Sequence, residues 1–156
     1  MSEASSSQAL NLGLLLFIPY RAMENRVFAA LAAAGFDEFT PAQARVMQRI
    51  GPEGSRLTEL AAAAQVTKQT ASFLVDQLER TGYVVRTPDP TDARARLVRI
   101  ADRGAAAQPV AAAAVAEVEA EWRAHLGERE WARLRGALSR LRGITDLPQG
   151  GGVSRG

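Results

Sequence analysis

The sequence contains no cysteine and a single histidine, His125, among its 156 residues. Without cysteine, a disulfide framework, a cysteine-ligated zinc site, a catalytic thiol and a thiol redox sensor are all excluded. One histidine also leaves little support for a catalytic triad or a histidine-rich metal site. Because the chain has no nucleophile–base pair and no phosphate-binding loop either, we expect no enzyme, no metal and no cofactor.

Long hydrophobic runs are also missing. The apolar stretch from Ala9 to Ile18 is ten residues long, whereas a membrane-spanning helix needs about 18 to 20. Residues 1–7 are serine-rich and lack the positive charge that precedes a signal-peptide core. We therefore expect a cytoplasmic protein without a membrane partner. The segments 1–7 and 145–156 offer little to bury and are predicted to be disordered.

Lysine is almost absent, since eighteen of the nineteen basic residues are arginine and only Lys68 is lysine. Arginine suits the recognition of phosphates and nucleic-acid grooves, so its distribution along the chain matters. Residues 41–103 carry ten basic and seven acidic groups, whereas residues 1–40 carry two and four. The positive charge is concentrated in the middle of the chain, a distribution that favours nucleic-acid binding but is also compatible with a solvated surface.

The N-terminal segment predicts one long helix from about Gln8 to Ala34, with apolar residues at helical spacing. Pro19 lies inside it, and an interior proline costs about 3 kcal/mol in a helix. We therefore expect either a bend at Pro19 or two abutting helices. Gly35 is a suitable residue to end this segment.

The central segment has the pattern of a helix-turn-helix. Thr40, followed by proline and then Gln43, predicts a capping box for a helix to about Arg49. A short helix over 57–64, a break at 65–67 and a helix over 68–81 capped by Thr67 follow. The last helix is amphipathic, and its predicted core side consists of Ala71, Leu74, Val75 and Leu78.

The pattern then changes to strands. Residues 83–86 and 97–100 are β-branched runs of strand length, which predict a hairpin with a long tip over 87–96. A hairpin directly after a helix-turn-helix is a wing. Arg94 and Arg96 lie on the far side of this tip.

Two further helices are predicted over 102–144, each with an apolar stripe and together rich in alanine. Together with the N-terminal helix they have no evident intramolecular core that would cover their stripes, so we expect them to pair with a second copy of the chain. Trp122 and Trp131 fall on these stripes and are assigned to packing, with His125 at the surface or the interface.

Over about residues 10–144 the chain resembles the MarR family of bacterial transcription regulators. The resemblance rests on the run from Leu57 to Arg86 and on the wing signature Asp92, Arg94 and Gly104. The chain departs from the family at Ile100-Ala101, where members often have Leu-Thr, so that Asp102 is the alternative cap for the next helix.

The resemblance implies a mainly α fold, a homodimer and a palindromic operator in double-stranded DNA. It divides the chain into an N-terminal dimerisation helix over 8–39, a winged helix-turn-helix module over 40–101 and C-terminal dimerisation helices over 102–144. The module consists of a three-helix core and a β-hairpin wing. In such a dimer the recognition helices enter successive major grooves about 34 Å apart.

The candidate DNA contacts fall into three groups. On the recognition helix they are Thr67, Lys68, Gln69, Thr70, Ser72 and Phe73. On the wing, Arg94 is expected in the minor groove with Asp92 holding it through an ion pair, and Arg86 and Arg96 on phosphates. Arg56 and Thr58, at the start of a helix, are further phosphate candidates. For each of these residues the simpler alternative is a solvated polar surface.

Many members of the family bind small aromatic or phenolic effectors, and Phe17, Tyr20 and Arg21 beside Pro19 are the residues expected to line such a cleft. The same residues are also explained as core and a solvated arginine. The sequence therefore predicts a ligand-responsive repressor. A non-specific architectural DNA-binding protein and a winged-helix protein-docking module remain open as alternatives.

Overall fold

The structure is a computed structural model, and it describes residues 9–146. Over this part of the chain it contains six helices and one β-hairpin. The elements, in chain order, are α1 (Leu12–Ala33), α2 (Pro41–Met47), α3 (Leu57–Ala63), α4 (Lys68–Arg80), β1 (Val84–Asp89), β2 (Asp92–Ile100), α5 (Asp102–Leu126) and α6 (Glu128–Thr145). The predicted disorder of residues 1–7 and 145–156 lies outside the described residues except at 145 and 146, where Thr145 is the last residue of α6.

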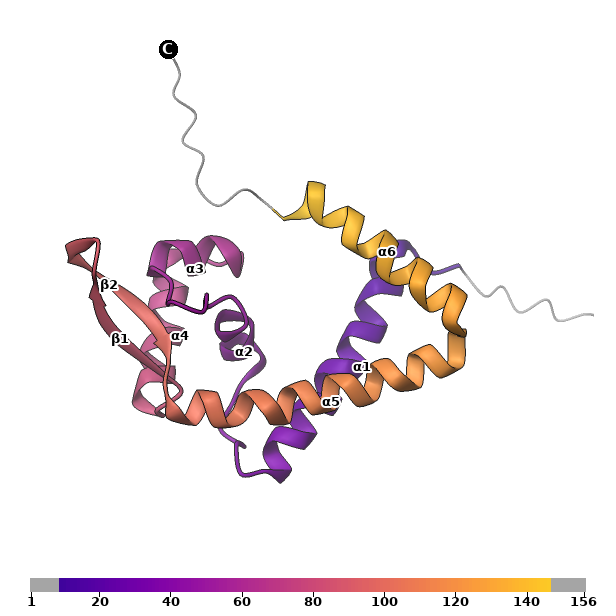
Figure 1. The fold of residues 1–156 in the computed structure, drawn as a ribbon, viewed down its shortest axis with the longest axis horizontal. Coiled ribbons are helices and arrows are strands. Elements are labelled where there is room, and N and C mark those ends of the chain that lie inside the picture. The colour runs from indigo at the N-terminus through magenta and orange to yellow at the C-terminus, as the bar shows by residue number, and fades with distance from the viewer. Residues whose placement is uncertain (1–8, 147–156) are drawn as a thin grey trace, which may run out of the picture.

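The molecule has two parts, a lobe and a helical arm (Figure 1). The lobe contains α2, α3, α4 and the hairpin, and the arm contains α1, α5 and α6. Helix α5 runs from the lobe into the arm, so the wing and α6 lie at opposite ends of the molecule. The fold is thus mainly helical with a hairpin wing, as the sequence predicts.

Helix α1 is continuous through Pro19, so the alternative of two abutting helices is wrong. The proline removes one hydrogen bond from a helix of 22 residues, which starts at a side-chain cap from Asn11 and packs along α5. The helix also begins later than the predicted Gln8. At its other end the Phe36 N–H donates to the Leu31 carbonyl oxygen at 2.8 Å, and Gly35 has φ +93°. This is the predicted glycine stop.

The lobe is built around α4. All four predicted core residues of this helix are buried, and they pack with Leu60, Val46 and Tyr83. The predicted capping box of α2 is present, with Thr40 Oγ1 accepting from the Gln43 N–H at 3.2 Å. Gln43 Nε2 also donates to Gln77 Oε1 at 3.2 Å, which joins α2 to α4. Helix α4 is therefore held on its inner side by both preceding helices.

The wing differs from the prediction, because its strands are longer and its tip shorter. The strands pair from Val84 opposite Ile100 to Asp89 opposite Asp92, so that only two residues form the turn where ten were expected. Pro88 belongs to β1 rather than to a loop. It is tolerated because β1 has no neighbour on its other side, so a missing N–H disrupts no ladder there. Strand β2 also pairs with Ser55 through Val98.

Helix α5 starts against the wing. Gly104 packs so closely there that a Cβ atom would lie 2.3 Å from the Tyr83 carbonyl oxygen. The expectation that Asp102 caps this helix is wrong. Asp102 is its first helical residue, and Ala101 occupies the cap position without a side-chain bond. Pro109 lies inside α5.

The arm leaves a large apolar surface uncovered. Exposed apolar side chains are concentrated on the N-terminal half of α1, the end of α5 and one face of α6: Leu12, Leu14, Leu15, Leu16, Phe17, Ile18, Tyr20, Leu126, Leu134, Leu138, Leu141 and Ile144. Soluble monomers rarely expose such continuous apolar patches. None of the helices within residues 9–146 is long and apolar enough to cross a membrane.

Candidate nucleic-acid interface

The first turn of α4 presents polar side chains to solvent. Thr67 caps the helix, since its Oγ1 accepts from the Thr70 N–H at 3.1 Å. Lys68, Gln69 and Thr70 are all exposed, and none of them belongs to the core. The donors and acceptors of this turn are therefore available to an external partner.

Phe73 lies one turn further along α4 and is 57% exposed. Ser72 beside it is half-buried, so it is less accessible than the sequence suggested. An exposed phenyl ring next to hydrogen-bonding side chains matches what a major groove offers, because a thymine methyl is an apolar contact beside polar base edges. The buried side of α4 fixes the orientation of this exposed side.

Arg94 and Arg96 are exposed on β2. Neither side chain forms an ion pair with another of the residues 9–146. From Pro88 to Asp89, β1 advances by one residue, whereas their partners on β2, Arg96 and Asp92, are four residues apart. The extra residues, 93–95, form a bulge, and Arg94 lies at its centre.

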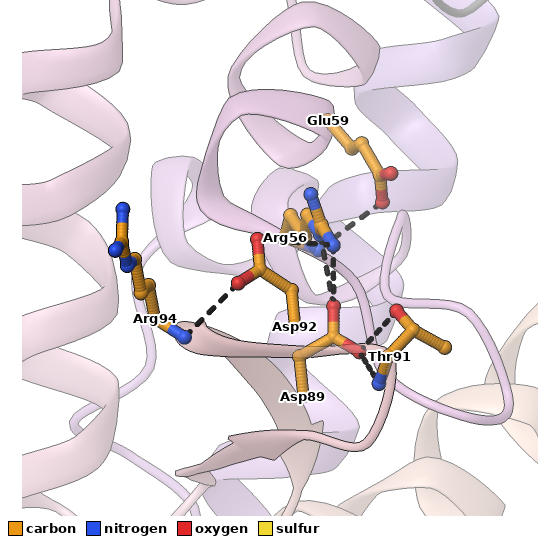
Figure 2. Close-up of polar contacts among 6 residues, drawn as sticks. All are labelled: Arg56, Glu59, Asp89, Thr91, Asp92 and Arg94. Atoms are coloured by element: carbon orange, nitrogen blue, oxygen red, sulfur yellow. Dashed lines mark hydrogen bonds and ion pairs between the residues drawn. The ribbon is translucent and has the colours of Figure 1, made fainter.

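Asp92 orients Arg94 in a different way from the predicted ion pair. Its Oδ1 accepts from the Arg94 backbone N–H at 3.0 Å, while the guanidinium of Arg94 points away from the carboxylate (Figure 2). The other oxygen of Asp92 lies 4.0 Å from Arg56 Nη2. Asp92 thus fixes the backbone of the bulge and forms no ion pair with the Arg94 side chain.

Arg86 does not have the position expected of a phosphate contact. Its side chain is only 18% exposed, and its guanidinium pairs with Asp76 at 2.8 Å and with Glu79 at 3.0 Å. Both carboxylates belong to α4. Arg86 therefore ties the wing to α4. The same two ion pairs neutralise its charge within the lobe.

Arg56 is also engaged inside the molecule. Its Nε and Nη2 both donate to Asp89 Oδ2, at 2.9 and 2.7 Å. These bonds come first among the causes that raise the pKa of Arg56. Thr58, in the first turn of α3, is exposed. Of the two residues expected to contact phosphates from this helix, only Thr58 is unengaged.

Asp89 is a residue that the sequence reasoning missed. It is 7% exposed, and its Oδ1 accepts from the Thr91 N–H at 2.8 Å and the Thr91 hydroxyl at 2.7 Å. These bonds from Thr91, followed by those from Arg56, lower the pKa of Asp89 to about 2. The available signal was the spacing of Asp89 and Thr91 around a proline, which is typical of an Asp-stabilised turn.

Comparison with known proteins identifies this arrangement. The family model of the MarR family matches residues 38–95, which is the lobe up to the bulge of the wing. MarR itself has a similar structure, with a TM-score of 0.71 and 25% identity over 88% of this chain and 98% of that one. In sequence and in fold the chain is similar to the MarR family. No curated protein sequence matches it.

Two further solved structures that resemble this chain contain aromatic compounds. CouR from Rhodococcus jostii, bound to p-coumaroyl-CoA, has a TM-score of 0.68 and 27% identity over 91% of this chain and 97% of its own. A MarR family protein of Mycobacterium tuberculosis in complex with salicylic acid has a TM-score of 0.61 and 26% identity over 86% and 98%. Members of the MarR family are DNA-binding transcriptional regulators, not enzymes, and this chain is therefore a transcriptional regulator that binds DNA.

The residues expected to line an effector cleft lie in two different places. Phe17 and Tyr20 line a hollow of about 790 Å³ between α1, α5 and α6, together with Trp122 and His125. Arg21 is not part of it, because its guanidinium pairs with the buried Glu24. Trp122 and His125, which the sequence assigned to packing or to the interface, thus also line this hollow, whereas Trp131 is buried.

Proposed function

We propose that the protein is a sequence-specific regulator, and in particular a homodimeric repressor of a palindromic operator. The observation that carries this proposal is the exposure, on one lobe, of the polar first turn of α4 and of two arginines on the wing that form no ion pair with another of the residues 9–146. The first turn supplies donors and acceptors for base edges in the major groove. The wing supplies guanidinium groups for the minor groove and for phosphates.

The proposed DNA contacts follow from this placement. Gln69 bonds an adenine edge, Lys68 a guanine or a phosphate, and Phe73 a thymine methyl, with Thr67, Thr70 and Ser72 beside them. Arg94 enters the minor groove. Arg96 and Thr58 contact phosphates. Arg56 and Arg86 are left out because their guanidinium groups are already paired with carboxylates.

The homodimer is supported by the uncovered apolar faces of the arm. Pairing two copies through α1, α5 and α6 would remove these faces from water and place two lobes side by side. A two-fold dimer reads a palindrome, with the two α4 helices about 34 Å apart. A regulator of this kind acts in the cytoplasm, where bacterial DNA lies.

Release by a small aromatic effector is the remaining part of the proposal. It is supported by the aromatic lining of the arm hollow and by the compounds bound to the two relatives. An effector would release the operator only if it binds the dimer more tightly at another spacing of the lobes than at the spacing that the operator requires.

Selection of binding sites from random duplexes, at several salt concentrations, tests the function. We expect a palindromic consensus, and we expect salicylate to weaken binding to it. No consensus but a salt slope of about −0.9 per contacted phosphate would indicate an architectural protein. If the selection yields no consensus and no salt-dependent complex forms, the protein is a protein-docking module.

Two substitutions assign the contacts. Arg94→Ala should abolish tight operator binding while the dimer persists, because the wing then lacks its minor-groove side chain. Gln69→Ala should cost about 1 to 3 kcal/mol of binding and relax the preference at one base pair per half-site. Unchanged affinity of Arg94→Ala would refute the wing contact.

A further inference from the structure

The start of α3 and the tip of the wing are joined by four polar side chains, which we call the wing clamp. They are Arg56, Asp89, Thr91 and Asp92 (Figure 2). Asp89 is the centre of the clamp, because its two oxygens accept four hydrogen bonds, two from Arg56 and two from Thr91. Such charge-assisted bonds are stronger and more directional than neutral ones.

Both ends of the clamp are fixed in the lobe. Arg56 is the residue before the first turn of α3, and its N–H donates to Glu59 Oε2 at 3.1 Å. Asp89 is the last paired residue of β1. The base of the wing is held separately, since the Ser55 N–H donates to the Val98 carbonyl oxygen at 3.0 Å. Besides the tie of Arg86 to α4, the wing is thus attached to the start of α3 at two points along its length.

The second attachment lies where Arg94 is presented. The bulge at 93–95 begins at Asp92, and the carboxylate of Asp92 faces Arg56 on one side and the Arg94 N–H on the other. A two-stranded hairpin is only marginally stable by itself, so its tip needs an external contact to have a fixed position. The clamp is the contact between this tip and the helix-turn-helix.

We propose that Arg56 and Asp89 are positioning residues for DNA recognition, holding the wing tip at a set distance from α4 so that Arg94 meets the minor groove while Gln69 meets the major groove. This inference rests on the proposed function, because it assigns Arg94 to DNA. Arg56 therefore acts through the wing and contacts no phosphate, which replaces the role that the sequence suggested for it.

The clamp is expected to affect DNA binding much more than folding. The Arg56 side chain is partly exposed, so the ion pair is screened by solvent, and in Arg56→Gln the buried Asp89 keeps its two hydrogen bonds from Thr91. Losing the fixed tip, however, means that the wing must be ordered during binding, which lowers the affinity.

The test is a set of operator affinities for the full-length protein. Arg56→Gln and Asp89→Asn should each weaken binding by about tenfold, and the double variant should bind no more weakly than either. In an Arg94→Ala background, Arg56→Gln should have no further effect, because the clamp acts through Arg94. Arg129→Gln, on exposed α6 at the far end of the molecule, is the control for removing one positive charge and should leave affinity unchanged.

Two results would overturn the proposal. If Arg56→Gln still weakens binding in the Arg94→Ala background and lowers the salt slope by about 0.9, Arg56 is a phosphate contact. If both single variants bind like the parent protein, the clamp positions nothing.

Amide hydrogen exchange of the free protein separates this inference from the proposed function. The Thr91 and Arg94 amides should exchange faster in Arg56→Gln than in the parent protein, because both are bonded within the clamp. Unchanged exchange overturns the clamp. If exchange accelerates but the parent protein selects no operator, the proposed function fails while the clamp stands as the contact that orders the wing.

Discussion

Gln65 has a backbone conformation that glycine usually adopts. Its φ is +55°, and among residues 9–146 it is the only residue other than glycine with a positive φ. It follows the end of α3, where the Val66 N–H donates to the Ala61 carbonyl oxygen at 3.0 Å. The same backbone arrangement ends α1 at Gly35 and α4 at Gly82. Of these three helix-ending turns, the one before α4 is therefore the most strained, because a glutamine stands where the other two have glycine.

Replacing Gln65 by glycine should stabilise the protein by about 1 kcal/mol, because glycine adopts this conformation without steric cost. The measurement is the urea dependence of unfolding at constant protomer concentration. Gly82→Ala is the matched control. A Cβ at Gly82 would have room, with Arg103 Cβ at 3.8 Å, so that only the positive φ of +83° opposes it, and stability should fall by a similar amount. A destabilised Gln65→Gly would mean that the glutamine side chain contributes more than its backbone costs.

At the scale of elements, Glu38 joins three parts of the fold. Its Oε1 accepts from the Tyr83 hydroxyl at 2.9 Å and from Arg103 Nε at 2.8 Å. Tyr83 begins the wing, Arg103 lies in the first turn of α5, and Glu38 itself lies between α1 and α2. The guanidinium of Arg103 is also 5.3 Å from the centroid of the Tyr83 ring, a cation–π distance. The junction between lobe and arm is therefore polar and charged.

This junction predicts a pH dependence. A hydrogen bond from the backbone N–H of Glu38 to its own carboxylate, followed by those from Tyr83 and Arg103, lowers the pKa of Glu38 from 4.5 to about 2. A lowered pKa means that the ionised group stabilises the fold above about pH 4.5 and that this contribution is lost as the pH falls toward 2. Glu38→Gln should therefore be less stable at pH 7, and the difference should shrink below pH 4.5 and vanish near pH 2.

The measurement is the free energy of unfolding of both proteins across this pH range. Glu53→Gln, at an exposed carboxylate in the loop between α2 and α3, serves as the control and should show a smaller pH-dependent difference. A difference between Glu38→Gln and the parent protein that is constant from pH 7 to 2 would contradict the role of the charge.

At the scale of the whole molecule, the proposed dimer would cover the apolar surface of the arm. Leu138 of α6 is 40% exposed and lines the arm hollow, so in a dimer through this face it is buried. Leu138→Glu should convert the dimer to monomers, because burying a carboxylate without a partner costs several kcal/mol. Sedimentation equilibrium measures the change. Ala62→Glu, at an exposed position on α3, is the control and should remain dimeric.

Loss of the dimer should also weaken operator binding, since each lobe then binds its half-site separately. A dimer of Leu138→Glu with the parent affinity would place the interface on another face. The wing and α6 lie at opposite ends of the molecule (Figure 1), so a direct effect of this substitution on DNA contacts is not expected.

Local structure can be predicted from the sequence alone. Thr40, Thr67 and Gly35 mark helix ends through bonds within a few residues, and the buried side of α4 follows from helical periodicity. These signals are local, so they can be read along the chain. The family motif added the fold and the DNA-binding role.

Which polar groups are available to a partner depends on tertiary packing. Arg56, Arg86 and Arg94 are alike in sequence, yet the first two pair with carboxylates 33 and 10 residues away and only Arg94 remains available. Pro19 and Pro88 likewise depend on their surroundings, a packed long helix and an open strand edge. A side chain's partner is set by the packing of distant elements, and for that reason the sequence named the arginines of this site but not their roles.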